Sequence, residues 1–139
     1  MAGPARRLEP LIRAINRRDL AALAACFAPE FVSDTPAHPD RSFRGREQGG
    51  RNWARIFAAV PDLRATLVRA ALDGGHLWAE WGWAGTRADG NTFAMRGVTI
   101  FGLDEEQFTS VQFYMEPVQF GGPGPDAAVP QVLGSTATA

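Results

Sequence analysis

The sequence contains no lysine, and all 14 of its basic residues are arginine. This absence excludes chemistry that depends on a lysine amine, such as Schiff-base or pyridoxal-phosphate catalysis and phosphate-loop nucleotide binding. One cysteine and two histidines are present, which are too few for a structural zinc site and rule out a disulfide within the chain. We therefore expect an activity that needs neither a metal ion nor a cofactor.

Long apolar runs are also missing. No stretch approaches the roughly 18 apolar residues of a membrane span, and the N-terminus lacks the apolar segment of a signal peptide. The formal net charge is −1, whereas a nucleic-acid-binding domain needs a clustered positive excess. We therefore expect a cytoplasmic protein that binds neither membranes nor nucleic acid.

The overall amino-acid composition is that of a globular domain. Hydrophobic residues make up 45% of the chain and charged residues 21%, so a disordered or fibrous chain is not expected. The length of 139 residues corresponds to one domain. The end of the chain is rich in Gly, Pro and Ala, so we expect a single domain over residues 1–120 and a mobile tail over residues 121–139.

Helical spacing of apolar residues is confined to the first half of the chain. It predicts a helix that begins near Glu9, a second helix capped by Asp19 and ended by Pro29, and a third helix over residues 46–60. The segment FVSDTPAHPDRSFRG lies between the last two helices. Its prolines and polar residues predict one short strand followed by a long loop.

From residue 62 onward the pattern changes to strands. Residues 63–72, 76–87, 92–103 and 108–118 are rich in β-branched and aromatic residues and are separated by short turns. Because these turns are too short for crossover helices, the strands must form a mostly antiparallel meander. Helices followed by strands predict an α+β fold.

Four segments carry a resemblance to a known family: INRRDLAALAACFAPEFV, FRGREQGGRNWARIFAAVPDL, WAGTRADGNTFAMRGVTIF and QFYMEPV. Across about residues 8–120 the chain resembles the nuclear transport factor 2-like superfamily, in its SnoaL-like and ketosteroid-isomerase-like branch. The resemblance implies a cone in which three N-terminal helices pack on a curved sheet and leave a cavity. The superfamily includes isomerases, polyketide cyclases, epoxide hydrolases, dehydratases and non-enzymatic domains, so fold does not settle function.

The resemblance to the isomerases implies a general base at or next to Asp34. His38 follows in a loop held by two prolines, where its imidazole could act as an acid or an orienting donor. The alternative for Asp34 is a solvated acid that caps a turn. The isomerase's two hydrogen-bond donors match Leu11 and approximately Gly97, and neither side chain can donate. The steroid isomerase mechanism itself is therefore not expected.

Acids on the sheet are the alternative catalytic candidates. An epoxide hydrolase needs an Asp/Arg/Asp set, of which only Glu80 is matched, whereas the SnoaL-like cyclases use an acid that roughly matches Glu116. Tyr114 could donate to an oxyanion. Strand alternation places Tyr114 and Glu116 on the face opposite to Phe113, which favours an interface or solvent position for both.

Aromatic residues predict the walls of the cavity. Alternation places Trp81 and Trp83 on one face of their strand, and Trp78 and Glu80 on the other. The residues predicted to frame an enclosed cavity opening near Asp34 are Trp53, Phe57, Trp81, Met95, Thr99, Phe113 and Met115. These walls suit an apolar ligand.

Three functions remain open from the sequence. The first is a small cofactor-independent enzyme, of isomerase, cyclase or dehydratase type, that acts on an apolar or polycyclic small molecule. The second is a non-catalytic ligand-binding or dimerisation module, and the third is an epoxide hydrolase. Trp78, Val98 and Ile100 point away from the predicted cone, so we also expect a homodimer that covers this apolar face.

Overall fold

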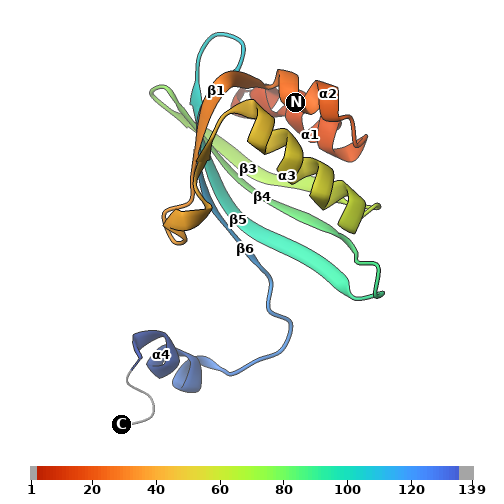
Figure 1. The fold of residues 1–139 in the computed structure, drawn as a ribbon. Coiled ribbons are helices and arrows are strands. Elements are labelled where there is room, and N and C mark those ends of the chain that lie inside the picture. Colours follow the sequence, from red (N-terminus) through yellow and green to blue (C-terminus); the bar gives the residue numbers. More distant parts are fainter. Residues whose placement is uncertain (1–2, 135–139) are drawn as a thin grey trace.

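The computed structural model describes residues 3–134, in which helices pack on one face of a curved sheet (Figure 1). The helical elements are η1 (Gly3–Leu8), α1 (Glu9–Asn16), α2 (Leu20–Ala25), η2 (Pro39–Arg41), α3 (Arg46–Ala59) and α4 (Pro125–Leu133). The strands are β1 (Phe27–Asp34), β2 (Phe43–Arg44), β3 (Arg64–Asp73), β4 (His76–Thr86), β5 (Thr92–Leu103) and β6 (Phe108–Pro117).

The six strands form one sheet in the order β2-β1-β6-β5-β4-β3. Strands β3 to β6 pair antiparallel with their neighbours in the sequence, and within residues 3–134 only the β1–β6 pair is parallel. Helices α1, α2 and α3 lie on the concave face. The predicted α+β fold, with three N-terminal helices on a mostly antiparallel sheet, is confirmed.

Two boundaries in the first half differ from the prediction. Asp19 caps α2 as expected, accepting a hydrogen bond from the backbone N–H of Ala22 at 3.0 Å. The helix ends at Ala25, however, and Pro29 lies inside β1. The β1–β6 register shifts between Phe27 and Val32, and a proline is tolerated where the ladder is irregular.

The long loop after β1 also contains more structure than predicted. Strand β2 has two residues and pairs antiparallel with β1 through Val32↔Arg44 and Ser33↔Phe43. Gly45 follows with a φ of 99° and donates its N–H to the Phe31 carbonyl at 2.7 Å. This turn redirects the chain from the sheet edge into α3.

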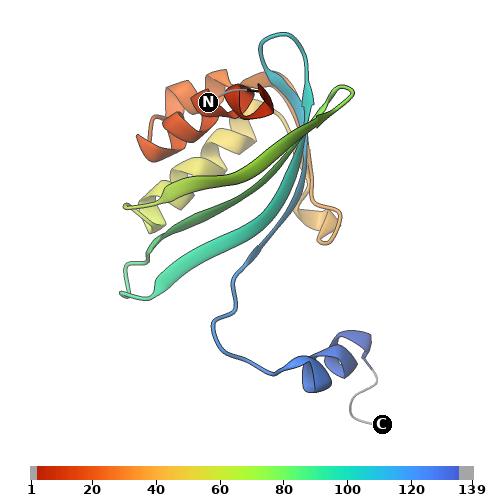
Figure 2. The same cartoon turned by 180° about the vertical axis from the view of Figure 1, so that it is seen from behind.

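The C-terminal segment contains a helix that its composition did not predict. Helix α4 begins at Pro125, where a proline costs no hydrogen bond, and ends at Leu133, followed by Gly134 with a φ of 74°. It lies away from the sheet in both ribbon views (Figure 2). Residues 135–139 of the expected tail lie outside the described residues, and the boundary at residue 120 stays a prediction.

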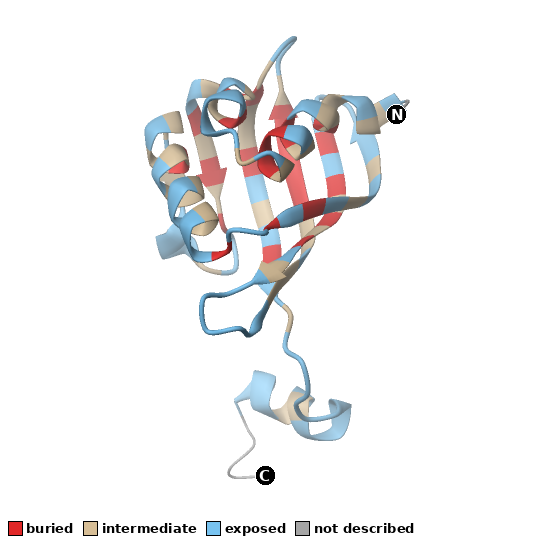
Figure 3. Ribbon diagram, turned by 90° about the vertical axis from the view of Figure 1, so that its right-hand side faces the viewer, coloured by how far each residue is buried: buried red, intermediate tan, exposed pale blue. Residues whose placement is uncertain are grey.

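The core fills the space between the helices and the concave face. On β4 the residues Leu77, Ala79, Trp81 and Trp83 are buried and alternate with more exposed neighbours, as the red and paler bands along the strands show (Figure 3). This alternation follows from the two-residue repeat of a strand with one covered face. Any cavity between the helices and the sheet is therefore lined by the side chains on the inner faces of the strands.

Candidate functional site

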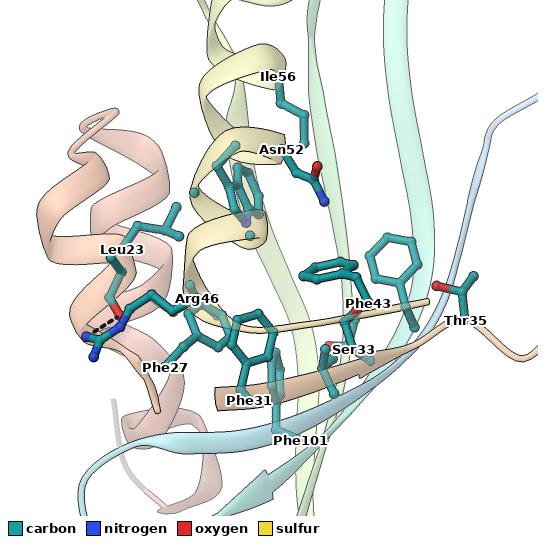
Figure 4. A pocket seen from close by; sticks show the side chains of 18 of the residues that line it. Leu23, Phe27, Phe31, Ser33, Thr35, Phe43, Arg46, Asn52, Ile56 and Phe101 are labelled. Atoms are coloured by element: carbon teal, nitrogen blue, oxygen red, sulfur yellow. Dashed lines mark hydrogen bonds between the residues drawn. The ribbon is translucent and has the colours of Figure 1, made fainter. Parts of the chain in front are cut away.

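A cavity of about 230 Å³ lies between the helices and the concave face of the sheet (Figure 4). It is partly enclosed and mainly apolar. The residues that line it are Leu11, Leu23, Ala24, Phe27, Phe31, Ser33, Thr35, Arg41, Phe43, Arg46, Gly49, Gly50, Asn52, Trp53, Ile56, Trp81, Trp83, Thr99, Phe101, Val111 and Phe113.

Aromatic rings from the sheet and from α3 form a continuous wall of this cavity. The ring centroid of Trp83 is 4.9 Å from that of Trp53 on α3, 5.8 Å from Phe113 on β6 and 5.5 Å from Trp81. Trp81 in turn contacts Phe101 at 6.4 Å. Rings at these separations and tilts hold one another in place, so the wall is rigid and mainly apolar.

The structure places four of the predicted wall residues in the lining and three outside it. Those that line the cavity are Trp53, Trp81, Thr99 and Phe113. Phe57 packs against Trp53 with a centroid distance of 5.6 Å, one turn further along α3. Met95 packs against the core, and Met115 is a fully buried core residue. These three side chains lie outside the cavity lining.

Few polar groups reach the cavity. They are the side chains of Ser33, Thr35, Asn52 and Thr99, and the charged residues Arg41 and Arg46. Arg41 is exposed, and Arg46 donates to the Ala24 carbonyl at 3.5 Å. Among residues 3–134, the lining contains no carboxylate, imidazole, thiol or phenol. The wall can therefore bind and orient a molecule, but no group in it can take up a proton near neutral pH.

Asp34 lies on the opposite face of β1 from the cavity. Its neighbours Ser33 and Thr35 are both buried and line the cavity, so alternation turns Asp34 outward beside Gln112 of β6. Asp34 accepts a hydrogen bond from the Ser42 hydroxyl at 3.2 Å, and Ser42 accepts from the Thr35 N–H at 3.0 Å. In this arrangement Asp34 joins the two ends of the loop over residues 35–42.

His38 and Glu116, predicted as separate candidates, are brought together. The His38 Nε2 is 2.9 Å from a carboxylate oxygen of Glu116, and both side chains are partly exposed. The pair links the same loop to the end of β6. It lies outside the cavity lining, on the outer side of the sheet.

The other two sheet candidates also face outward. Glu80 pairs with Arg69 of β3 at 2.8 Å, which leaves the epoxide-hydrolase hypothesis without an acid in the cavity. Tyr114 lies on the outer face and is 44% exposed. The sequence alternation had already favoured this face for Tyr114 and Glu116.

Gly97 has no room for any side chain. Its φ is 149°, and a Cβ built on it would lie 2.8 Å from the backbone Cα of Met115 and against the carbonyl oxygen of Tyr114. A residue with a donor side chain could not replace it without moving β6. The closeness of β5 to β6 thus excludes the donor that the isomerases carry at the matching position.

Other reactive groups are sparse. The Cys26 thiol donates to the Ala22 carbonyl at 3.4 Å, and burial raises its pKa, which makes it a poor nucleophile near neutral pH.

Across residues 3–134, no three His, Cys, Asp or Glu side chains come together as metal ligands. Within the same range, no helix is long and apolar enough to cross a membrane.

Several residues of β1, β2 and α3 line the cavity although they were not among the predicted wall residues. Alternation had placed Trp83 on the same face as Trp81, and the same rule applied to β1 would have turned Phe31 and Ser33 inward. No local signal identified Phe43, because β2 is short and only its pairing with β1 directs the ring.

The chain is similar to known proteins in both sequence and fold. A family model described as a SnoaL-like domain matches residues 8–111. A hypothetical protein with a ketosteroid isomerase-like fold from Catenulispora acidiphila, solved with trimethylamine, superposes with a TM-score of 0.68 at 24% identity, covering 78% of this chain and 84% of that one. No curated protein matches the sequence.

Two further solved structures share the fold. IdmH, a proposed polyketide cyclase from Streptomyces antibioticus, has a TM-score of 0.70 at 21% identity and covers 83% of this chain and 93% of its own. An LEH-like epoxide hydrolase from M. tuberculosis has a TM-score of 0.68 at 17% identity, with coverages of 81% and 82%. At these identities the similarity extends to the fold alone.

Proposed function

Since the chain belongs to the SnoaL-like domain family, we propose that its cavity binds an apolar polycyclic small molecule and positions it for an isomerisation or cyclisation that needs no cofactor. The observation that carries this proposal is the aromatic wall formed by Trp53, Trp81, Trp83 and Phe113. A similar fold in a protein described as a polyketide cyclase supports the reaction class.

The size of the cavity limits the ligand. A cavity of roughly 150 Å³ lined by apolar side chains holds one benzene ring, and drug-sized pockets begin at roughly 300 Å³. The 230 Å³ found here suits a molecule of about two fused rings. A larger polycycle would leave some of its rings outside the cavity.

Positioning is the catalytic contribution that this wall can make. Holding a flexible substrate with its reacting atoms in contact can remove a large part of a barrier, because the entropy of alignment is lost on binding rather than in the transition state. Neither Asp34 nor the His38–Glu116 pair lines the cavity. We therefore expect Asp34→Asn to keep both ligand binding and turnover.

A hundred-fold or larger loss of turnover in Asp34→Asn, with unchanged ligand affinity, would instead identify Asp34 as the general base. His38→Gln and Glu116→Gln test the same question for the pair on the outer side of the sheet.

Binding itself is tested by filling the cavity. Gly50 lines the cavity from α3, and a Cβ built on it has no atom within 4 Å. Gly50→Leu should raise the unfolding temperature, because leucine favours a helix over glycine by roughly 0.8 kcal/mol. It should also abolish the thermal shift that bicyclic apolar compounds produce in the unchanged protein.

Gly50→Ala is the matched control, since it improves the helix without filling the cavity and should keep the shift. Equal ligand-induced shifts in the unchanged protein and in Gly50→Leu would place the ligand elsewhere and refute the proposal.

The second candidate function is ligand binding without catalysis. No carboxylate or imidazole of the part of the chain that the structure describes lies in the lining, which favours this candidate. Product analysis after incubation with a bound bicyclic ketone or polyketide separates the two candidates, since a pure binding protein returns the compound unchanged.

We propose in addition that the protein forms a homodimer through the outer face of the sheet. Trp78 is 43% exposed there and lies opposite Ile100 in the strand register, with Val98 and Tyr114 in the next row. No element within residues 3–134 covers this face (Figure 2). A second copy would remove Trp78 and Tyr114 from water, whereas Ile100 is already buried at 8% exposed.

A further inference from the structure

A surface groove of about 590 Å³ adjoins the cavity. It is lined by the end of α3 and by the turn between β4 and β5, which lie at the same end of the sheet (Figure 1). The residues that line it are Arg55, Ile56, Ala59, Val60, Arg87, Ala88, Asp89 and Phe93. Ile56 also lines the cavity, so the groove and the cavity meet at this side chain.

Two arginines border the groove from different elements. Arg55 on α3 and Arg87 in the turn are both exposed, and neither takes part in any ion pair among residues 3–134. The guanidinium of Arg87 lies 5.7 Å from the centroid of the Phe93 ring, a contact that holds the cation against the apolar surface of the groove. Both cations are therefore available to a negatively charged ligand that also has an apolar part.

Asp89 is the only acid in the groove lining among residues 3–134. Both of its oxygens are already engaged, since one accepts from the backbone N–H of Asn91 at 2.9 Å and the other from the Asn91 side-chain amide at 3.1 Å. Two guanidinium groups and one carboxylate leave one positive charge in excess in the lining. A single carboxylate matches this excess, and its two oxygens suit the planar N–H donors of arginine.

We propose that the groove binds the carboxylate of a molecule whose rings occupy the cavity. The ligand is then an apolar ring acid, with about two fused rings joined to a side chain that ends in a carboxylate. This inference rests on the proposed function, because it names the chemical class of the ligand in the same cavity. The rings contact the aromatic wall, the side chain passes Ile56, and the carboxylate accepts hydrogen bonds from Arg55 and Arg87.

A pair of probe compounds isolates the negative charge. 4-(2-Naphthyl)butanoate has two fused rings and a carboxylate, and 4-(2-naphthyl)butanamide has nearly the same shape without the charge. Calorimetry at low ionic strength should show that the acid binds about 3- to 10-fold more tightly than the amide, as expected for two exposed ion pairs. The net charge of the whole chain is −1, so overall attraction does not produce this preference. High salt should reduce it, because exposed charges are screened.

Variants then test the two arginines one by one. Arg55→Gln and Arg87→Gln should each lower the preference for the acid, measured as the ratio of the two dissociation constants, by about 1.5- to 5-fold. Arg51→Gln is the matched control, because it removes the same charge from the same helix outside the groove, where Arg51 pairs with Glu47. This variant should leave the ratio unchanged. Since the ratio compares two ligands in one variant, a change in packing affects both and cancels.

The outcomes separate this inference from the proposed function. If the acid and the amide bind equally well, or if all three arginine variants change the ratio alike, the carboxylate site is wrong while the apolar cavity still stands. If the acid keeps its full affinity in Gly50→Leu, in which the cavity is filled, its rings lie outside the cavity and the inference is wrong. If neither compound binds to the unchanged protein, the proposed function fails and the carboxylate site fails with it.

Discussion

Three exposed aspartates, Asp62, Asp89 and Asp104, hold turns at the ends of strands. Asp62 accepts from the backbone N–H of Thr86 at 2.7 Å, Asp89 from that of Asn91 at 2.9 Å, and Asp104 from that of Gln107 at 2.7 Å. These hydrogen bonds favour the ionised carboxylates and lower the pKa of all three residues from the ordinary value of 3.8.

A pH dependence of stability follows from these aspartates. Since their pKa values are lower in the folded state, their contribution is complete above the unfolded pKa of 3.8 and is lost as the pH falls through the folded values. The free energy of unfolding in urea should therefore fall between about pH 5 and pH 2, and less steeply in the double variant Asp62→Asn, Asp104→Asn. Asp126→Asn, on α4, is the control and should follow the unchanged protein. Parallel curves for all three proteins would contradict this assignment.

At the level of the elements, β5 and β6 come into close backbone contact at Gly97. Gly97 lies between Trp81 of β4 and Met115 of β6 in the register, and its φ of 149° is unfavourable for any residue with a side chain. A glycine within a strand commonly marks such a close approach.

Gly97→Ala should destabilise the protein, because the added Cβ meets the backbone of β6. The backbone strain alone costs about 1–3 kcal/mol, and displacement of β6 adds to this cost. Urea denaturation measures the change. Gly75→Ala is the matched control, since a Cβ at Gly75 meets no atom within 4 Å. If both variants are as stable as the unchanged protein, the strands are further apart in solution than described here.

At the level of the whole molecule, the two faces of the sheet have different surroundings. The concave face is covered by the protein's own helices, whereas Trp78 and Tyr114 on the outer face are about half exposed. The ion pair between Arg69 and Glu80 and the pair between His38 and Glu116 flank this apolar strip. An apolar centre with a charged rim is typical of a protein interface.

The homodimer predicts a molecular mass near twice 15.0 kDa in light scattering at micromolar concentration. Trp78→Glu should dissociate it, because a charge placed at the centre of an apolar interface is left without a partner. Val132→Glu, at a highly exposed position of α4, should remain dimeric. A monomeric unchanged protein under these conditions would refute the dimer.

The last four strands could be predicted from the sequence, because they follow from local signals. Strand patterns with short turns predicted 92–103 and placed β3, β4 and β6 to within about one residue, and Asp19 identified the start of α2, whereas β2, α4 and the end of α2 were not predicted. The same alternation placed Trp81 inward, and Glu116 and Tyr114 outward.

The composition of the site was decided only by the tertiary structure. Which apolar residues enclose free space, and which fill the core, depends on how α3 and β2 pack over the sheet; local patterns do not separate Trp53 from Phe57 or Thr99 from Met95. Asp34 faces outward because β1 pairs with β6 in one particular register, and a shift of one residue would have turned it into the cavity. That register is made between segments nearly eighty residues apart, so only the folded chain determines it.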